Sequence, residues 1–507
     1  MASYQAPPIS DSKKEQVEVT PSFDVDDTHE KGIVSSELPE KFIIPTEEEE
    51  RRLVRKQDRV LMPMMMLIYL FFDLDGITLG NSKLAGLMED IDITGDQFNW
   101  AASAFSFGFI LCEVPANMLL QNFGARKWLS MTMFLSSIIL ASIASVHNGK
   151  GLIAGRFFLG CVQAAVFPGL VYYVSLWYTR KEQGARMAWF LVMGSVGSAV
   201  GGIVAYGIMF MDYTRGLRAW RWIFIIIAIP TFLVAVIVFL VLPDTPERQK
   251  RFLSPREREI AIYRLAKEKG AGSQEHFSWE RFKSVFKDWK VWVFAAINVT
   301  CMVPIVSLGI FMPSIVKGMG FSNLTAQGMS APPWVAAMIG MIVISWHSDK
   351  RGERGIHVFL FCMLACVGYL LLIVLVDRGW VALYVSAIIA TFCVFAANPP
   401  RVAWVANSFG DPTKKGIAIA FISSCASIGS VIGGQIYRED DKPLYIRGHA
   451  IALAFSGVTA LLSLLLKILL RRENKRRDAL SSEQYQKESH KVGDDVMYHS
   501  LLQRITA

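Results

Sequence analysis

Long apolar runs, separated by short polar loops, fill most of the chain between residues 60 and 470. There are twelve such runs. Each is close to the ~20 residues that a helix needs to cross ~30 Å of hydrocarbon. The pattern predicts an all-α membrane protein with twelve transmembrane helices. The predicted spans are Val60–Leu79, Phe98–Leu120, Trp128–Val146, Gly151–Tyr173, Met187–Met211, Trp222–Leu242, Val291–Val316, Thr325–Trp346, His357–Val376, Trp380–Pro400, Ile417–Tyr437 and Ala450–Leu470.

Polar segments divide the spans into two sets of six. Residues 243–290 form a charged stretch between spans six and seven, in which we expect one amphipathic helix near Pro255–Lys269. Residues 1–46 are rich in Pro, Ser, Asp and Glu, a composition typical of disorder. Glu47–Arg59 is expected to start a short interfacial helix. The predicted domains are thus two six-helix bundles, 47–242 and 291–470, with the linker between them and tails at 1–46 and 471–507.

Lys and Arg in the short loops predict the orientation. Basic pairs or clusters follow spans two, four, eight, ten and twelve, whereas the alternate loops are mostly poorer in bases. Arg215, Arg218 and Arg221, between spans five and six, are the exception. Because cytoplasmic loops carry an excess of Lys and Arg, both termini are expected in the cytoplasm.

Composition excludes several classes of function. The chain is 52% hydrophobic and only 19% charged, with a net charge of +8 that the loops and tails explain. Soluble domains are nearer a quarter charged. The seven cysteines lack zinc or disulfide spacing. With no phosphate-binding loop, nucleophile elbow or nucleic-acid motif either, we expect no enzyme, no ATP-driven pump, no cofactor, no metal and no nucleic-acid partner.

The two halves repeat a loop motif. Gly124 and Arg126 follow span two, and Gly352 and Arg354 follow span eight with the same spacing. Two homologous halves around a midplane site are typical of a secondary transporter. Within the spans, Arg156 stands out because an arginine in lipid costs at least ~2.5 kcal/mol. Arg156 either makes a structural hydrogen bond or binds an anion or takes part in proton transfer in a polar cavity between helices.

These features, in their order, resemble the major facilitator superfamily, its anion:cation symporter family and, more narrowly, the fungal allantoate and nicotinate permeases. The resemblance runs from about Leu61 to Asp478. The residues that carry it include Gly80-Asn81-Ser82-Lys83, Glu113-Val114-Pro115-Ala116-Asn117, Arg156, Gly160, Pro168, Ser175-Leu176-Trp177-Tyr178, Trp220-Arg221-Trp222, Leu242-Pro243-Asp244-Thr245-Pro246-Glu247, Trp404, Asn407 and Gly448-His449. The resemblance implies proton-coupled uptake of a small organic anion or vitamin-like solute.

Three charges usual in that family are absent. Gly76 stands where the family has an arginine, Gln163 where it has a glutamate, and Ile227-Ala228 where it has Glu-Gly. The substrate is therefore expected to carry less charge than a typical family anion. The remaining intramembrane acids are the candidate proton carriers: Asp75 first, then Glu113, then Asp73. Glu113 can also be a structural group, and Asp73 can be a helix-end acid that meets water.

Spans one, four, seven and ten line the substrate path in transporters of this kind. Arginine binds planar anions through two parallel hydrogen bonds, so Arg156 and Arg401 are candidate counter-charges for a carboxylate. Further rings and amides are expected at the substrate, although aromatic residues near span ends are often interface anchors. The candidate substrate residues are Arg156, Gln163, Tyr172, Tyr173, Asn298, Arg401, Trp404 and Asn407. Arg126, Asp349 and Arg354 are expected to make gating contacts.

The resemblance thus implies a proton-coupled symporter of a nicotinate- or allantoate-like carboxylate, which we expect to be monomeric and to lie in the plasma membrane. Two alternatives stay open at this point. The same fold can export a metabolite or drug in exchange for protons, and a related protein can sense a nutrient without carrying it. The short tails argue against a sensor.

Overall fold

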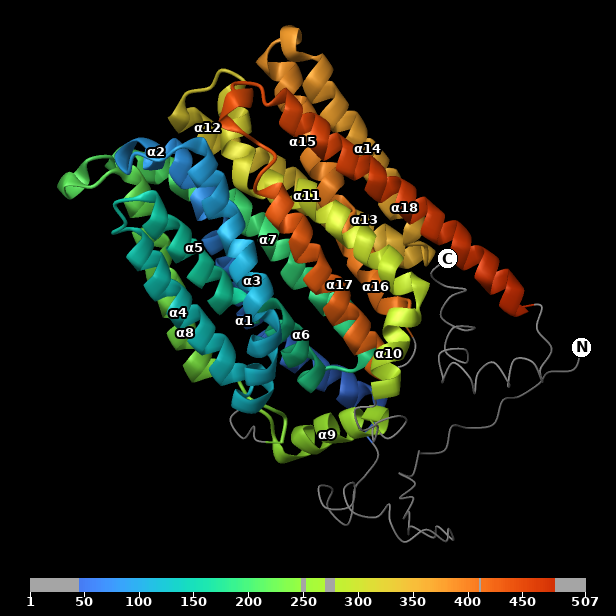
Figure 1. Ribbon diagram of the computed structural model, residues 1–507. Coiled ribbons are helices and arrows are strands. Elements are labelled where there is room, and N and C mark those ends of the chain that lie inside the picture. Colours follow the sequence, from blue (N-terminus) through green and yellow to red (C-terminus); the bar gives the residue numbers. More distant parts are fainter. Residues whose placement is uncertain (1–44, 248–251, 270–278, 410–411, 479–507) are drawn as a thin grey trace, which may run out of the picture. The chain divides into compact units, whose positions relative to one another are not determined.

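A computed structural model describes residues 45–247, 252–269, 279–409 and 412–478 (Figure 1). The helices of these residues are α1 (Glu47–Leu84), α2 (Leu87–Asp90), α3 (Gly95–Phe123), α4 (Ala125–Ile143), α5 (Gly149–Gln163), α6 (Val166–Trp177), α7 (Arg180–Ile208), α8 (Ala219–Val241), α9 (Pro255–Lys269), α10 (Trp279–Lys287), α11 (Trp289–Gly318), α12 (Asn323–Met329), α13 (Ala331–Arg351), α14 (Gly355–Val374), α15 (Trp380–Ala396), α16 (Asn398–Asn407), α17 (Pro412–Gly433) and α18 (Ile446–Asp478). Short 3-10 turns lie at Met209–Met211, Thr214–Gly216, Val376–Arg378 and Glu439–Asp441. The predicted all-α membrane fold is confirmed.

Eleven helical segments of the described residues are long and apolar enough to cross a membrane. They coincide with every predicted span but the third. At that position lies α4, a helix of 19 residues whose first turn contains Arg126 and Lys127. These two charges shorten its apolar part.

The start of α1 follows from its sequence. Thr46 Oγ1 accepts from the Glu49 amide at 3.3 Å, and the Glu49 carboxylate accepts from the Thr46 amide at 3.0 Å. This reciprocal pair caps a helix, and the acidic first turn suits the positive end of the helix dipole. The expected interfacial helix and the first span form one continuous helix of 38 residues.

Corresponding helices of the two sequence repeats pack in the same way. In the first repeat α1 contacts α7, α3 contacts α5 and α4 contacts α8; in the second, α11 contacts α17, α13 contacts α15 and α14 contacts α18. The repeated loop glycines Gly124 and Gly352 both have positive φ, 82° and 63°. Glycine adopts this conformation without the steric cost that other residues incur, which explains why both copies of the motif contain it.

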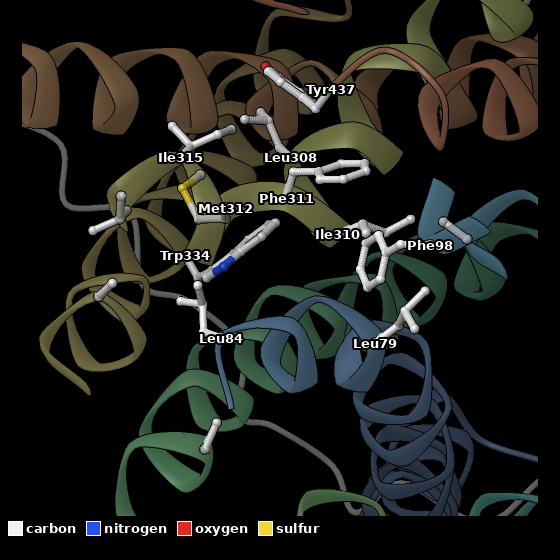
Figure 2. Close-up of a cluster of buried hydrophobic side chains, with 14 of the residues drawn as sticks. Leu79, Leu84, Phe98, Leu308, Ile310, Phe311, Met312, Ile315, Trp334 and Tyr437 are labelled. Carbon is white, nitrogen blue, oxygen red and sulfur yellow. The ribbon is translucent and has the colours of Figure 1, made fainter. Parts of the chain in front are cut away.

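The two repeats meet closely at the end of the helices opposite α9, which we call the outer end. Figure 2 shows Leu79, Phe98, Ile310 and Phe311 converging there. The rings of Phe98 and Phe311 lie 6.1 Å apart. A Cβ atom on Gly80 would lie only 2.0 Å from the Ile310 carbonyl oxygen, so α1 and α11 touch backbone to backbone.

Polar contacts reinforce this outer-end seal. The Asn99 amide donates to the Tyr437 carbonyl at 3.1 Å, and Lys83 Nζ lies 2.6 Å from the Glu439 carboxylate. Gln327 Nε2 donates to the Asn81 carbonyl at 2.7 Å. Each contact joins a residue of the first repeat to one of the second.

The linker helices attach to different repeats. Helix α9 is bound to α1 through Lys56 and Glu257, whose charged atoms lie 2.6 Å apart. Just before α11, Asp288 lies 3.1 Å from Lys414 of α17, against which α10 also packs. The predicted helix near residues 255–269 is therefore present as α9. Residues 1–44 and 479–507 of the predicted tails lie outside the described residues, while residues 471–478 continue α18.

Candidate substrate and coupling site

Span four is broken into α5 and α6, and Arg156 lies on the α5 part. Its side chain is 1% exposed. Its two terminal nitrogens donate to the backbone carbonyls of Asp75 at 3.4 Å and Gly76 at 3.3 Å. The guanidinium carbon lies 5.0 Å from the centre of the Phe105 ring, a cation–π distance. Arg156 Nε has no hydrogen-bond partner among the described residues. Arg156 therefore joins α5 to α1 and still has a donor to offer.

Asp75 is fully buried at the centre of a small polar network. One carboxylate oxygen accepts from Gln163 Nε2 at 2.8 Å. The other lies 3.2 Å from Thr231 Oγ1, whose single proton is shared between this oxygen and the Ile227 carbonyl at 2.8 Å. Two sequence candidates, Asp75 and Gln163, are thus in direct contact. Sequence reasoning missed Thr231, although it is the single polar residue in the apolar run from Ile223 to Val241. A hydroxyl isolated in this way was the available signal.

Arg401 occupies the matching broken span of the second repeat, on α16. Its side chain is 2% exposed and donates to the side-chain oxygens of Asn298 and Asn398. Asn298 in turn donates to the Phe294 carbonyl at 2.7 Å. Among the residues that the structure describes, Arg401 forms no ion pair and its Nε has no partner. A buried cation held only by neutral amides is costly unless an anion joins it.

The predicted aromatic candidates have packing contacts. Tyr173 is fully buried and its hydroxyl donates to the Pro243 carbonyl at 2.8 Å, which fixes α6 to the start of the linker. Trp404 is 1% exposed, and its ring lies 5.4 Å from that of Phe294. Tyr172 and Asn407 are half-buried. These contacts explain Tyr173 and Trp404 without a substrate, and their role in binding stays a prediction.

Glu113 joins the two repeats. It is 5% exposed, and one carboxylate oxygen accepts from Ser424 Oγ of α17 at 3.0 Å. The predicted gating residues lie at helix ends: Asp349 in the last turn of α13, Arg354 just before α14 and Arg126 in the first turn of α4. Asp349 and Arg354 form an ion pair at 2.9 Å, whereas the Arg126 guanidinium lies 5.6 Å from the Phe239 ring. Burial lowers the pKa of Arg354, and Asp349 opposes that shift.

Residues 65–434 match the family model described as Major Facilitator Superfamily. The chain belongs to this superfamily. It is 33% identical over 79% of its length to the MFS transporter prlL of a fungal species (strain NRRL 50135), of which it covers 83%. It is 31% identical to an uncharacterized transporter of Schizosaccharomyces pombe, over 90% of this chain and 91% of that one.

Solved structures show the same fold. A bacterial homolog of the human lysosomal transporter Spinster, in an inward-facing and occupied conformation, matches with a TM-score of 0.59 at 14% identity. The match covers 80% of this chain and 96% of that one. As a major facilitator, the chain is a multi-pass integral membrane protein and a secondary transporter, and it is not an enzyme.

Two surface hollows lie away from the buried arginines. A hollow of about 520 Å³ between α3 and α5 is lined by Trp100, Phe107 and Phe158, and one of about 420 Å³ beside α5 is lined by Ile139 and Val162 among others. Their linings are almost entirely apolar and contain none of the predicted site residues. In a membrane transporter such surfaces face lipid, so the buried polar groups, and not these hollows, define the candidate site.

Proposed function

We propose that this major facilitator is a proton-coupled symporter of small organic carboxylates, as its resemblance to the fungal allantoate and nicotinate permeases implies. The observation that supports this most directly is Arg401. It is a buried guanidinium with a free Nε and with no carboxylate partner among the described residues. A substrate carboxylate supplies the missing negative charge, and Asn298 and Asn398 hold the guanidinium in place to receive it.

The first repeat supplies the coupling group in this proposal. Asp75 accepts a hydrogen bond on each oxygen, and Arg156 binds the carbonyl of the same residue. When Asp75 takes a proton, Arg156 loses a nearby negative charge, which favours binding of an anion. Glu113 is the second candidate because its bond to Ser424 crosses between the repeats and must break when they move apart. We place the transporter in the plasma membrane, where a proton gradient drives uptake.

The test is uptake of labelled nicotinate, allantoate and short-chain carboxylates in a permease-deficient yeast strain, at pH 5 and pH 7, with and without a protonophore. We expect acid-stimulated, protonophore-sensitive uptake of at least one compound. Arg401→Gln should raise its KM at least ~10-fold, since a hydrogen bond to a charged group contributes ~1.5–3 kcal/mol. Arg401→Lys keeps the charge but not the forked geometry of the guanidinium, so its KM should lie between those of the unmodified protein and Arg401→Gln.

Arg378→Gln is the matched control, because Arg378 is an exposed arginine of the same repeat. It should transport like the unmodified protein. Unchanged KM in Arg401→Gln would refute the role of Arg401. Loss of preloaded compound that is faster at acid external pH, without any uptake, would instead identify an exporter.

A further inference from the structure

Asp73, two residues before Asp75 on α1, is a second acid inside the membrane-spanning helices, and its setting is different. One carboxylate oxygen accepts from Ser198 Oγ of α7 at 2.9 Å. Among the described residues Asp73 forms no ion pair. Asp75 is completely buried, whereas Asp73 is partly exposed. Asp73 is therefore the more accessible of the two acids.

Glycines of α7 leave room for the Asp73 carboxylate. A Cβ atom on Gly194 would lie 3.3 Å from one of its oxygens, and a Cβ atom on Gly197 would lie 3.3 Å from the other. Tyr69 Cε1 is also 3.3 Å from the Gly194 position. The tyrosine ring and the carboxylate therefore lie side by side against the bare backbone of α7.

Tyr69 is the centre of an aromatic cluster. Its ring centre lies 5.5 Å from those of Phe72 and Phe190, and 6.3 Å from that of Phe167. Tyr69, Phe72 and Phe167 are only partly buried. Aromatic faces attract cations, and a carboxylate beside them adds a full opposite charge. We call Asp73, Tyr69, Phe72 and Phe167 the aromatic–acid site.

None of the residues that the structure describes supplies a cation to this site. An ionised acid at membrane depth is costly and normally has a partner. A structural role as acceptor for Ser198 accounts for one oxygen only. In addition, Gly76 leaves open space where the resembled family has an arginine, since a Cβ atom there would meet nothing within 4 Å. The partner is missing from the described residues and can come from the substrate.

We propose that the transported substrate is a zwitterion, with its ammonium or quaternary nitrogen at the aromatic–acid site and its carboxylate at Arg401. The Arg401 half of this proposal rests on the proposed function, whereas the Asp73 half is independent of it. A zwitterion carries no net charge, so its transport together with a proton moves one positive charge inward. A simple carboxylate transported with one proton moves none.

The experiment uses two matched pairs of probes: N-methylnicotinate with benzoate, and 4-aminobutyrate with butyrate. Binding to the purified, full-length transporter is measured as thermal stabilisation, and transport as uptake and current in proteoliposomes at a set membrane potential. We expect each zwitterion to stabilise the protein at lower concentration than its anionic partner, and its uptake to carry inward current. Asp73→Asn should weaken zwitterion binding at least ~10-fold while anion binding changes less than ~2-fold.

Two further variants separate the charge from the fold. Asp73→Glu keeps the charge and should partly restore zwitterion binding. Ser198→Ala removes the hydrogen bond to Asp73 but not the charge, and should keep the preference for the zwitterion. If Arg401→Gln leaves all binding unchanged but Asp73→Asn still weakens only the cationic probes, then the proposed function fails and the cation site stands.

Three results would overturn the proposal. The first is stabilisation by the anions alone, or by none of the four probes. The second is equal weakening of both members of a pair in Asp73→Asn. The third is loss of acid stimulation for every probe in Asp73→Asn with binding intact, which would make Asp73 a proton carrier and not a substrate ligand.

Discussion

At the scale of single residues, Asp75 differs from the other intramembrane acids because both of its oxygens accept hydrogen bonds from the same repeat. Asp75→Asn should fold, since Thr231 can still donate to the remaining oxygen. Gln163 Oε1, which has no partner among the described residues, can accept from the new amide. The variant cannot exchange a proton. We expect it to lose accumulation driven by a pH gradient and to keep exchange of labelled for unlabelled substrate in preloaded vesicles.

The control is Thr231→Val, which removes one hydrogen bond and leaves the carboxylate. It should still accumulate substrate at pH 5. If Asp75→Asn accumulates as much substrate as the unmodified protein, the proton-coupling group is not Asp75 but Glu113 or an acid outside this network.

The sequence was sufficient to name several buried polar residues of the spans but not to pair them. Intramembrane charges are rare, so Arg156, Asp75 and Arg401 could be recognised from their positions in apolar runs. Which donor each one meets depends on helix rotation, and periodicity alone does not specify that rotation. For this reason Tyr173, a candidate substrate residue, lies against the Pro243 carbonyl, and Thr231 was overlooked.

At the scale of elements, α9 is attached to the first repeat through Arg264. This side chain is 9% exposed and forms ion pairs with Glu50 of α1 and Glu182 of α7. Arg264→Ala leaves two acids facing each other without their cation. We expect a lower melting temperature by a few degrees, because the pairs are partly shielded from water but their acidic members are partly exposed. The measurement is a thermal unfolding curve of the purified protein.

Arg258→Ala is the control for this element. Arg258 lies on the same helix, is partly exposed and has no side-chain partner among the described residues. Its replacement should leave the melting temperature within about one degree. An equal loss in both variants would show that helix propensity, and not the ion pairs, holds α9 in place.

The contact between Lys56 and Glu257 gives α9 a pH dependence. Burial raises the pKa of Glu257, but its hydrogen bonds to Lys56 and Ser254 outweigh that and leave the pKa below its usual value of 4.5. An acid whose pKa is lowered by folding stabilises the folded protein at pH values above the pKa it has in the unfolded chain. This stability is lost as the pH falls through the pKa of the folded state. The contact is therefore fully present at neutral pH.

Elements were easier to predict than their breaks. Length and hydropathy placed the spans, because lipid demands continuous helices of about 20 residues. The break before Asn398-Pro399-Pro400 was foreseeable, since the residue before a proline disfavours the helical conformation. The break between α5 and α6, at Ala164 and Ala165, also has a proline signal, because Pro168 is the third residue of α6 and has no N–H to donate to the Ala164 carbonyl. Pro168 was named from the sequence, but this break, which lies at the corresponding place in the first repeat, was not predicted.

At the scale of the whole molecule, alternating access requires the outer-end seal to open and close. The seal depends on Gly80, where any Cβ atom would collide with the Ile310 carbonyl at 2.0 Å. Gly80→Ala must push α1 away from α11 and thereby disfavour the closed outer end. Because a transporter interconverts between such states, a penalty on one shifts the population to the other. We expect slower uptake and an outer end that is open for a larger part of the time.

The measurement is labelling of Ser103→Cys by a membrane-impermeant maleimide added outside intact cells. Ser103 is fully buried between the repeats, where its hydroxyl donates to the Val431 carbonyl at 3.0 Å, so labelling requires the seal to open. Labelling should be several-fold faster in Gly80→Ala. Gly309→Ala is the matched control, because a Cβ atom there meets nothing within 4 Å. It should label and transport normally. If Ser103→Cys is instead labelled rapidly from the cytoplasmic side, the orientation predicted from the loop charges is reversed. If Ser103→Cys is labelled at the same rate alone, with Gly80→Ala and with Gly309→Ala, the backbone contact at Gly80 does not limit opening.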